Sequence, residues 1–244
     1  MIDVGYGSEH RVGFRLLGLL WAWGMLLGGT LAVSEALANE EEPFRAVLAA
    51  AQAQDRSGLQ SLKAAGSLDR VDAEGRSVLW WLTARRDYDA MALLIELGVE
   101  VDHHDPARSG GVIDPTPFLY AGAHGDTRAL RLLYEAGART DRLNYYGGTA
   151  LIPAAEKGYR DAVRYLLAET DVAVNHVNRL GWTALMEAVV LSGESEQQTE
   201  IVRLLLAHGA DPAIADRDGV TALQHARRRR LDALVELLEA ASPP

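Results

Sequence analysis

The sequence predicts an all-α solenoid of stacked helix-turn-helix units, and three observations support this. Gly-x-Thr-Ala-Leu is written three times, at residues 147–151, 181–185 and 219–223. Each copy is followed by two short apolar segments at helical spacing, separated by a polar loop. A Ser or Thr in the matching place recurs at intervals of 39, 33, 34 and 38 residues, at Ser77, Thr116, Thr149, Thr183 and Thr221. A period of about 33 residues is typical of repeats that bury their apolar faces only against their neighbours.

Each unit opens with a turn and a capped helix. We expect Thr149, Thr183 and Thr221 to N-cap the first helix of their units, because a hydroxyl there accepts an otherwise unpaired amide. Pro117 or an alanine follows at the first helical position, where a missing N–H costs nothing. The second segment carries paired leucines that pack on the adjacent unit. Glycines then suit the left-handed position that ends this helix, at Gly98, Gly137 and Gly209.

Three departures from the pattern stand out. "PARSGGVIDP" at 106–115 lengthens the third turn, where we expect it to contribute contacts to a partner. "SGESEQQ" at 192–198 lies between the two helices of the fifth unit, and we expect it to be tolerated slack. The sixth unit lacks the loop glycine that other units have at Gly125 and Gly158, which leaves the shape of its helical turn open.

The repeat pattern divides the chain into a leader, a linker and one repeat domain. We expect a short acidic linker at 39–43 and a repeat domain at 44–241. The first and last units lack parts of the pattern and are predicted to be caps. The predicted repeats span about 44–71, 72–104, 105–143, 144–177, 178–215 and 216–241.

The segments "TPFLYAGAHGD", "GGTALIPAAEKG" and "VNHVNRLGWTALMEAV" resemble those of ankyrin-repeat proteins. Their residues are also similar to those of a bacterial subgroup that is often exported. The resemblance covers about 44–241. It implies β-turn fingers and first helices that form a concave surface, on which family members usually bind a partner protein. It also implies that the positions left free by the fold make the contact.

These free positions, carried over one by one, hold the candidate binding residues. Tyr, Trp, Leu and Arg are common among them, and such residues are enriched at interface hot spots. Packing of finger on finger is the alternative role for Tyr146, Leu180 and Trp182. The partner-binding candidates are Tyr145, Tyr146, Lys157, Arg179, Leu180, Trp182, Leu191, Arg217, Arg85 and Arg86. The other carried-over positions are Glu74, Arg76, Ala123, His124, Gly148, Glu156, Val190, Asp218, Val220, Arg228 and Arg229.

The N-terminus has the order of a secretory signal. Arg11 and Arg15 precede an apolar run at 16–33, and "ALA" at 36–38 offers small residues to a signal peptidase. We therefore expect a signal peptide at 1–38, cleavage after Ala38 and a periplasmic protein. The run is close to the length of a spanning helix, so an uncleaved membrane anchor is the alternative.

Composition and motif searches exclude several functions. The chain has no cysteine, which excludes disulfides and thiolate sites. No phosphate-cradling loop, nucleophile elbow or zinc-protease helix is present, so we expect no enzyme, metal or cofactor. "HHD" at 103–105 is predicted to be a solvated turn. The net charge of −10 argues against nucleic acid, and "RRRR" at 227–230 is expected to be solvated or paired with acids.

The sequence therefore predicts a monomeric, nonenzymatic module that binds a partner protein in the cell envelope. An inhibitor or immunity protein that caps a periplasmic toxin or enzyme is the alternative. A membrane-tethered scaffold is a further one, should the N-terminal segment stay uncleaved.

Overall fold

The computed structural model describes residues 29–108, 112–191 and 195–241, with side chains from residue 41 on. The chain divides into two compact units, 1–43 and 44–244. Residues 1–28, which hold most of the expected signal peptide, lie outside the described part. Among the described residues, no helix is both long and apolar enough to cross a bilayer.

The acidic segment 39–43, expected as a linker, is helical and belongs to α2 (Gly29–Gln52). Its three successive glutamates, at 40–42, are good helix formers. Pro43 lies inside this helix, where its ring nitrogen cannot donate a hydrogen bond. The segment carries no apolar periodicity, so the sequence pattern alone does not indicate a helix there.

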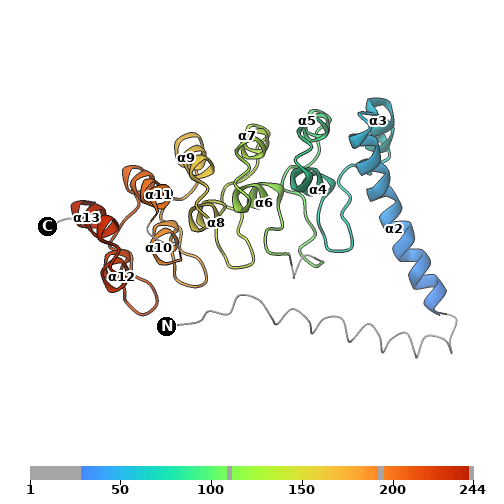
Figure 1. Ribbon diagram of the computed structural model, residues 1–244. Coiled ribbons are helices and arrows are strands. Elements are labelled where there is room, and N and C mark those ends of the chain that lie inside the picture. The colour runs from blue at the N-terminus through green and yellow to red at the C-terminus, as the bar shows by residue number, and fades with distance from the viewer. Residues whose placement is uncertain (1–28, 109–111, 192–194, 242–244) are drawn as a thin grey trace. The chain divides into compact units, whose positions relative to one another are not determined.

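From residue 44 on, the described chain is a stack of helix pairs, as predicted. Figure 1 shows successive pairs side by side, and from α4 on a loop leads into each inner helix. We call these loops fingers and number them by repeat. The inner helices are α4 (Val78–Arg85), α6 (Pro117–Ala123), α8 (Leu151–Glu156), α10 (Ala184–Val190) and α12 (Ala222–Arg229). The outer helices are α3 (Arg56–Ala64), α5 (Tyr88–Glu96), α7 (Thr127–Glu135), α9 (Arg160–Glu169), α11 (Glu196–Ala207) and α13 (Asp232–Ala241).

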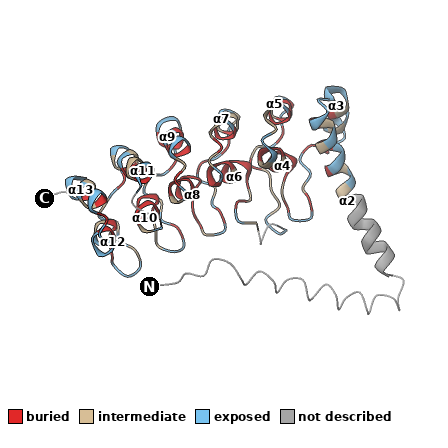
Figure 2. Cartoon of the chain, viewed as in Figure 1, coloured by how far each residue is buried: buried red, intermediate tan, exposed pale blue. Residues whose placement is uncertain are grey.

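The core of the stack runs between the helix pairs. A continuous cluster of buried side chains extends from Phe44 to Leu238. Figure 2 shows buried residues where helices meet their neighbours and exposed residues along the finger tips and outer helices. Each pair therefore completes its core only through the adjoining pairs, which confirms the predicted all-α solenoid.

Hydroxyl capping of the inner helices is confirmed in the fifth and sixth repeats. The hydroxyls of Thr183 and Thr221 accept the backbone N–H three residues on, at 3.2 and 3.3 Å. Ser77 and Thr116 do the same for α4 and α6, at 3.2 and 3.3 Å. These bonds satisfy amides that have no partner within the helix.

The prediction that Thr149 caps α8 is wrong. The N-cap of α8 is Ala150, and the hydroxyl of Thr149 is buried without a hydrogen-bond partner. In the other four repeats the residue four places after the cap donates its N–H to the cap carbonyl, as Glu187 does to Thr183 at 3.0 Å. Pro153 holds this place in the fourth repeat and has no N–H to donate. The first helical bond is lost, so the helix begins later.

The turns keep one geometry with different residues. Gly98, Gly137 and Gly209 have φ of 82°, 94° and 88°, the predicted left-handed conformation. In the sixth repeat, Arg230 takes the place of the loop glycine and adopts φ 59°. The missing glycine therefore leaves the shape of the turn intact, and a strained arginine fills it.

The insertion in the fifth repeat is not slack over its whole length. Residues 192–194 lie outside the described part, whereas Ser195 caps α11 and Gln198 lies in its first turn. The buried Gln198 amide donates to the carbonyls of Ala155 and Ala188, at 3.2 and 2.9 Å. It thus joins α8 to α10, because the last carbonyls of both helices lack partners within their own helix.

Candidate protein-binding face

Four fingers are held by one side-chain device. The residue five places before the recurring Ser or Thr is an Asp or Asn, whose side-chain oxygen accepts two backbone N–H groups at 2.9–3.0 Å. These bonds close the turn from within, as Asp and Asn commonly do. The four residues are Asp72, Asn144, Asn178 and Asp216.

The same residues join the fingers to the inner helices. Trp81 Nε1 donates to Asp72 Oδ2 at 2.6 Å, and Asn178 Nδ2 donates to Glu187 Oε1 at 3.0 Å. In the sixth repeat, His225 Nε2 lies 2.7 Å from Asp216 Oδ2. Each partner lies nine residues further on. Fingers and inner helices therefore form one continuous, preorganised surface, which we call the finger face.

In the fourth repeat this link runs between fingers. Pro153 stands nine residues after Asn144 and offers no polar side-chain atom. The amide of Asn144 donates instead to Asp114 of the third finger, at 3.4 Å.

Three apolar candidates are exposed, two on the fourth and fifth fingers and one at the C-cap of α10. Tyr145, Leu180 and Leu191 are 53%, 51% and 50% exposed. The other large apolar side chains that are exposed, among the described residues, belong to the third, fourth and fifth fingers; they are Ile113, Leu143 and Val177. Exposed apolar area in one region is a common mark of an interaction site.

Trp182 and Tyr146 are half-buried. Trp182 packs against the core, and the Tyr146 ring meets Tyr145 edge-on, with centroids 5.3 Å apart. Packing between neighbouring residues thus accounts for much of both side chains, and their role toward a partner stays a prediction.

Three basic candidates bind backbone carbonyls of the preceding repeat. Arg179 Nη1 donates to Tyr145 O at 2.9 Å, and Arg217 Nη2 donates to Arg179 O. Lys157 Nζ donates to Ala123 O, the last residue of α6, at 2.9 Å. A cation suits this carbonyl end of a helix. These side chains link adjacent repeats, and their contact with a partner stays a prediction.

Arg85 and Arg86 lie at the end of α4. Arg86 Nε approaches the buried carboxylate of Asp126 to 3.5 Å. The guanidinium carbon of Arg85 lies 5.1 Å from the centre of the Trp81 ring, a cation–π contact.

Buried carboxyl groups also line the finger face. Burial, followed by repulsion from Glu156, raises the pKa of Glu187 to about 7, although its bond from Asn178 lowers it. Glu187 Oε2 is buried without a hydrogen-bond partner. Burial likewise raises the pKa of Asp114 and that of Glu156. No group of three His, Asp or Glu side chains in the described residues is arranged to hold a metal.

Comparison with known proteins gives the family. The family model for ankyrin repeats, in its three-copy form, matches residues 107–176 and 170–243. The ankyrin repeat protein YahD of Escherichia coli K12 is 34% identical over 195 residues, which are 80% of this chain and 94% of YahD. The chain belongs to the ankyrin-repeat family. Ankyrin repeats are, in general, modules of protein–protein interaction.

Solved ankyrin structures share the fold. An ankyrin repeat domain from Acinetobacter baumannii AYE is 42% identical with a TM-score of 0.69, and the match covers 80% of this chain and 96% of that one. The ankyrin repeat protein EF0377 is 33% identical with a TM-score of 0.70, and covers 80% and 97%.

Sequence reasoning missed an aromatic cluster at the N-terminal end of this ankyrin face. Trp80, Trp81 and Tyr120 pack together there, and the "VLWWLTA" segment reads only as an apolar helix. The size of the two tryptophans could have indicated the cluster. The residues at the matching two positions of the last three repeats are smaller pairs: Ile-Pro, Met-Glu and Gln-His.

Proposed function

We propose that this ankyrin-repeat chain is a nonenzymatic module that binds a partner protein through the finger face, in the cell envelope. One observation carries the proposal: the exposed large apolar side chains gather on the third to fifth fingers and the end of α10. The outer helices contribute none of those in the described residues. Apolar residues on a rigid surface order at low entropic cost when a partner binds.

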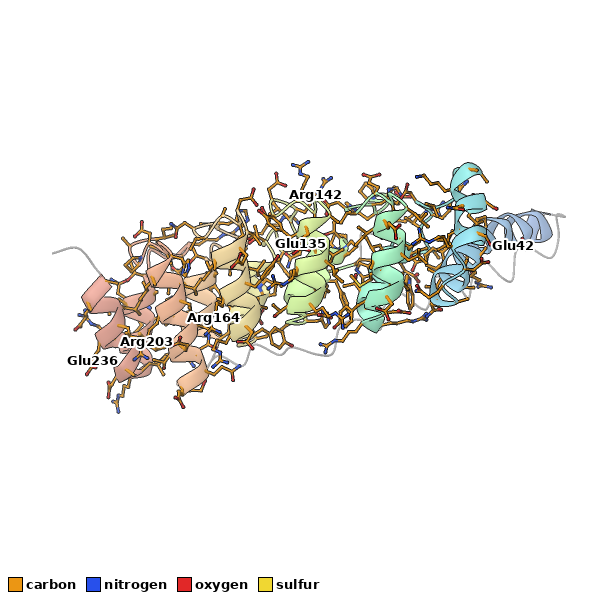
Figure 3. The ribbon with its side chains drawn as sticks, turned by 90° about the horizontal axis from the view of Figure 1, so that it is seen from above. Glu42, Glu135, Arg142, Arg164, Arg203 and Glu236 are labelled. Atoms are coloured by element: carbon orange, nitrogen blue, oxygen red, sulfur yellow. The ribbon has the colours of Figure 1, made fainter. Side chains whose placement is uncertain are left out.

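The test replaces two of these residues. Tyr145→Ser and Leu180→Ser remove exposed apolar area, so we expect partner capture to fall about tenfold or more, as for central interface residues. Arg164→Ser and Arg203→Ser on the outer helices α9 and α11 are the matched controls (Figure 3). Urea unfolding of each variant separates lost binding from lost folding. Capture that survives both finger substitutions, or that falls equally with both controls, would contradict the proposal.

Export is the second part of the proposal, and the order of residues in 1–38 supports it. We expect the mature protein in the periplasmic fraction with Asn39 as its first residue. Fractionation with N-terminal sequencing measures this. A protein that begins at Met1 and pellets with membranes contradicts cleavage and supports an anchor instead.

A further inference from the structure

The aromatic cluster of the second and third repeats is a compact group of rings and cations. The guanidinium carbon of Arg76 lies 4.9 Å from the centre of the Trp80 ring and 4.6 Å from that of Trp81. The Trp80 ring meets Tyr120 of α6 edge-on at 4.6 Å. Tyr120 in turn stacks on His124 at 3.8 Å. The cluster therefore bridges the second finger, α4 and α6.

The rings are fixed before any partner arrives. Trp80 Nε1 donates to the carbonyl of Asp114 at 2.8 Å, and Trp81 Nε1 donates to Asp72 at 2.6 Å. Both indole donors are thus used within the protein. Trp81 and Tyr120 remain half-buried, so part of each side chain is left for contact beside the guanidinium groups over Trp81 and the imidazole stacked on Tyr120. Rigid aromatic surface of this kind binds with a small entropic cost.

Three arginines surround the rings, and two of them form ion pairs with carboxylates. Arg76 is paired with Asp72 at 2.7 Å and Glu74 at 2.8 Å. Arg86 shares Asp126 with the hydroxyl of Tyr88. Arg85 is exposed, and among the described residues no carboxylate lies within ion-pair distance of it. Its guanidinium contacts the face of the Trp81 ring instead.

We propose that this patch, Arg85 with Trp81 and Tyr120, binds a partner polypeptide segment that carries an acidic side chain next to an aromatic or aliphatic one. The inference rests on the proposed function and names the chemistry of the partner. The carboxylate binds the Arg85 guanidinium as a charge-assisted pair, and the neighbouring apolar side chain packs against the exposed parts of Trp81 and Tyr120. A guanidinium already stacked on an indole is oriented for such a pair.

A polypeptide fits this patch better than a nucleic acid. A phosphate backbone needs a row of cations, because its affinity comes from many neutralised phosphates. The patch offers one arginine that has no ion pair with any described residue, on a chain of net charge −10. A carboxylate with an apolar neighbour matches the one cation and the rings beside it.

The experiment selects ligands from a display library of random peptides, each about a dozen residues long. The full chain, Arg85→Glu and Arg203→Glu are panned in parallel. Both substitutions make the same charge change, and Arg203 lies on the outer helix α11 (Figure 3). Selected peptides are then labelled and their Kd values measured by fluorescence anisotropy, with unfolding curves for each variant.

We expect enriched peptides in which Asp or Glu adjoins Phe, Tyr, Trp, Leu or Ile. Arg203→Glu should keep their affinity, and Arg85→Glu should weaken it about tenfold or more, as expected for a lost charge-assisted bond. Arg85→Lys keeps the charge without the planar fork and should fall between the two.

Four results would overturn the inference. They are no enrichment, enrichment of basic or neutral peptides, affinity that Arg85→Glu leaves unchanged, and equal Arg85-dependent binding of an oligothymidylate of about 20 nucleotides. Peptides that survive Arg85→Glu but are lost with Leu180→Ser dock on the middle fingers. That outcome overturns this inference and leaves the proposed function standing.

Discussion

Residues in left-handed turns differ in what they cost the fold. Gly125 and Gly158 adopt φ of 65° and 78°, which glycine takes without a steric penalty. Arg230 adopts φ 59° in the matching turn of the sixth repeat, where a side chain crowds the backbone. The sixth repeat therefore carries strain that the third and fourth do not.

Arg230→Gly should relieve this strain. We expect the free energy of unfolding to rise by about 0.5–1 kcal/mol, after the extra unfolded-state entropy of glycine is allowed for. Urea unfolding measures it. The converse change, Gly125→Ala, places a Cβ 2.5 Å from the Tyr159 ring at positive φ, and should destabilise. A destabilised Arg230→Gly variant would show that the arginine side chain makes contacts that outweigh its backbone strain.

Glu187 makes stability depend on pH. Its folded pKa of about 7 lies above its ordinary value of 4.5, so the folded state binds the proton more tightly. The resulting stability is fully present below pH 4.5 and is lost as pH rises through 7. Glu187→Gln does not titrate and keeps the acceptor for Asn178. At pH 8 we expect the free energy of unfolding of this variant to exceed that of the native chain by about 1–3 kcal/mol. Its free energy of unfolding should also change less with pH.

Urea unfolding at several pH values between 5 and 8, spanning the shift that burial causes, checks this. Glu236→Gln, on the outer helix α13, controls for the loss of one negative charge (Figure 3). A Glu187→Gln profile with the slope of the native chain in this range would contradict the assignment.

At the scale of elements, the second, fifth and sixth fingers are turns that are each held to their inner helix by one side-chain pair. The pair is Asn178 with Glu187 in the fifth repeat and Asp216 with His225 in the sixth. The hydrogen bond from His225 lowers the pKa of Asp216. Because the two pairs occupy matching positions, one should replace the other.

We predict that the sixth-repeat pair can be moved into the fifth repeat. Asn178→Asp alone sets two carboxyl groups against each other and should destabilise at pH 8. Adding Glu187→His should recover stability, with a favourable coupling of about 1 kcal/mol or more in a double-mutant cycle. Additive single effects would show that the matching positions are not equivalent in geometry.

Neighbouring inner helices are also joined by single side chains. Gln198 serves α8 and α10 together, so Gln198→Met removes its hydrogen bonds to the carbonyls of Ala188 and Ala155 at nearly unchanged volume, while Ala155 O keeps the bond from Gly158 N–H. We expect a loss of about 1–3 kcal/mol by urea unfolding. The adjacent, exposed Gln197 also donates to a backbone carbonyl, that of Gly158. Gln197→Met makes the same chemical change at the surface and should lower the free energy of unfolding by clearly less. An equal loss in both variants would contradict the bridging role of Gln198.

At the scale of the whole molecule, the regular part of the stack follows from spacing alone. The recurring Ser or Thr and the leucine pairs predict where helices begin and which faces are buried. The start of α8 could not be predicted so, because Pro153 removes a backbone bond that the Thr149 pattern assumes. Local exceptions of this kind appear only when the hydrogen bonds are traced.

For the candidate site, the exposure of residues on the fingers could be predicted from the sequence, but their contacts could not. Tyr145 and Leu180 are exposed on the fingers, as the repeat positions suggest. The bond from Arg179 to the carbonyl of Tyr145 depends on how one finger lies over the next, so the sequence pattern of a single repeat does not predict it. The cluster around Trp81 escaped for the same reason, since its rings come from two repeats.

The central claim is that the finger face, and not the outer helices, meets a partner protein. The test places a photocrosslinking residue at Tyr145, Leu180 or Leu191 in one set of variants, and at Arg164, Arg203 or Glu236 in another, and irradiates intact cells. We expect a discrete crosslinked protein from the finger positions and none from the outer ones. Crosslinks of equal strength from the outer helices, or none from the fingers, would contradict it.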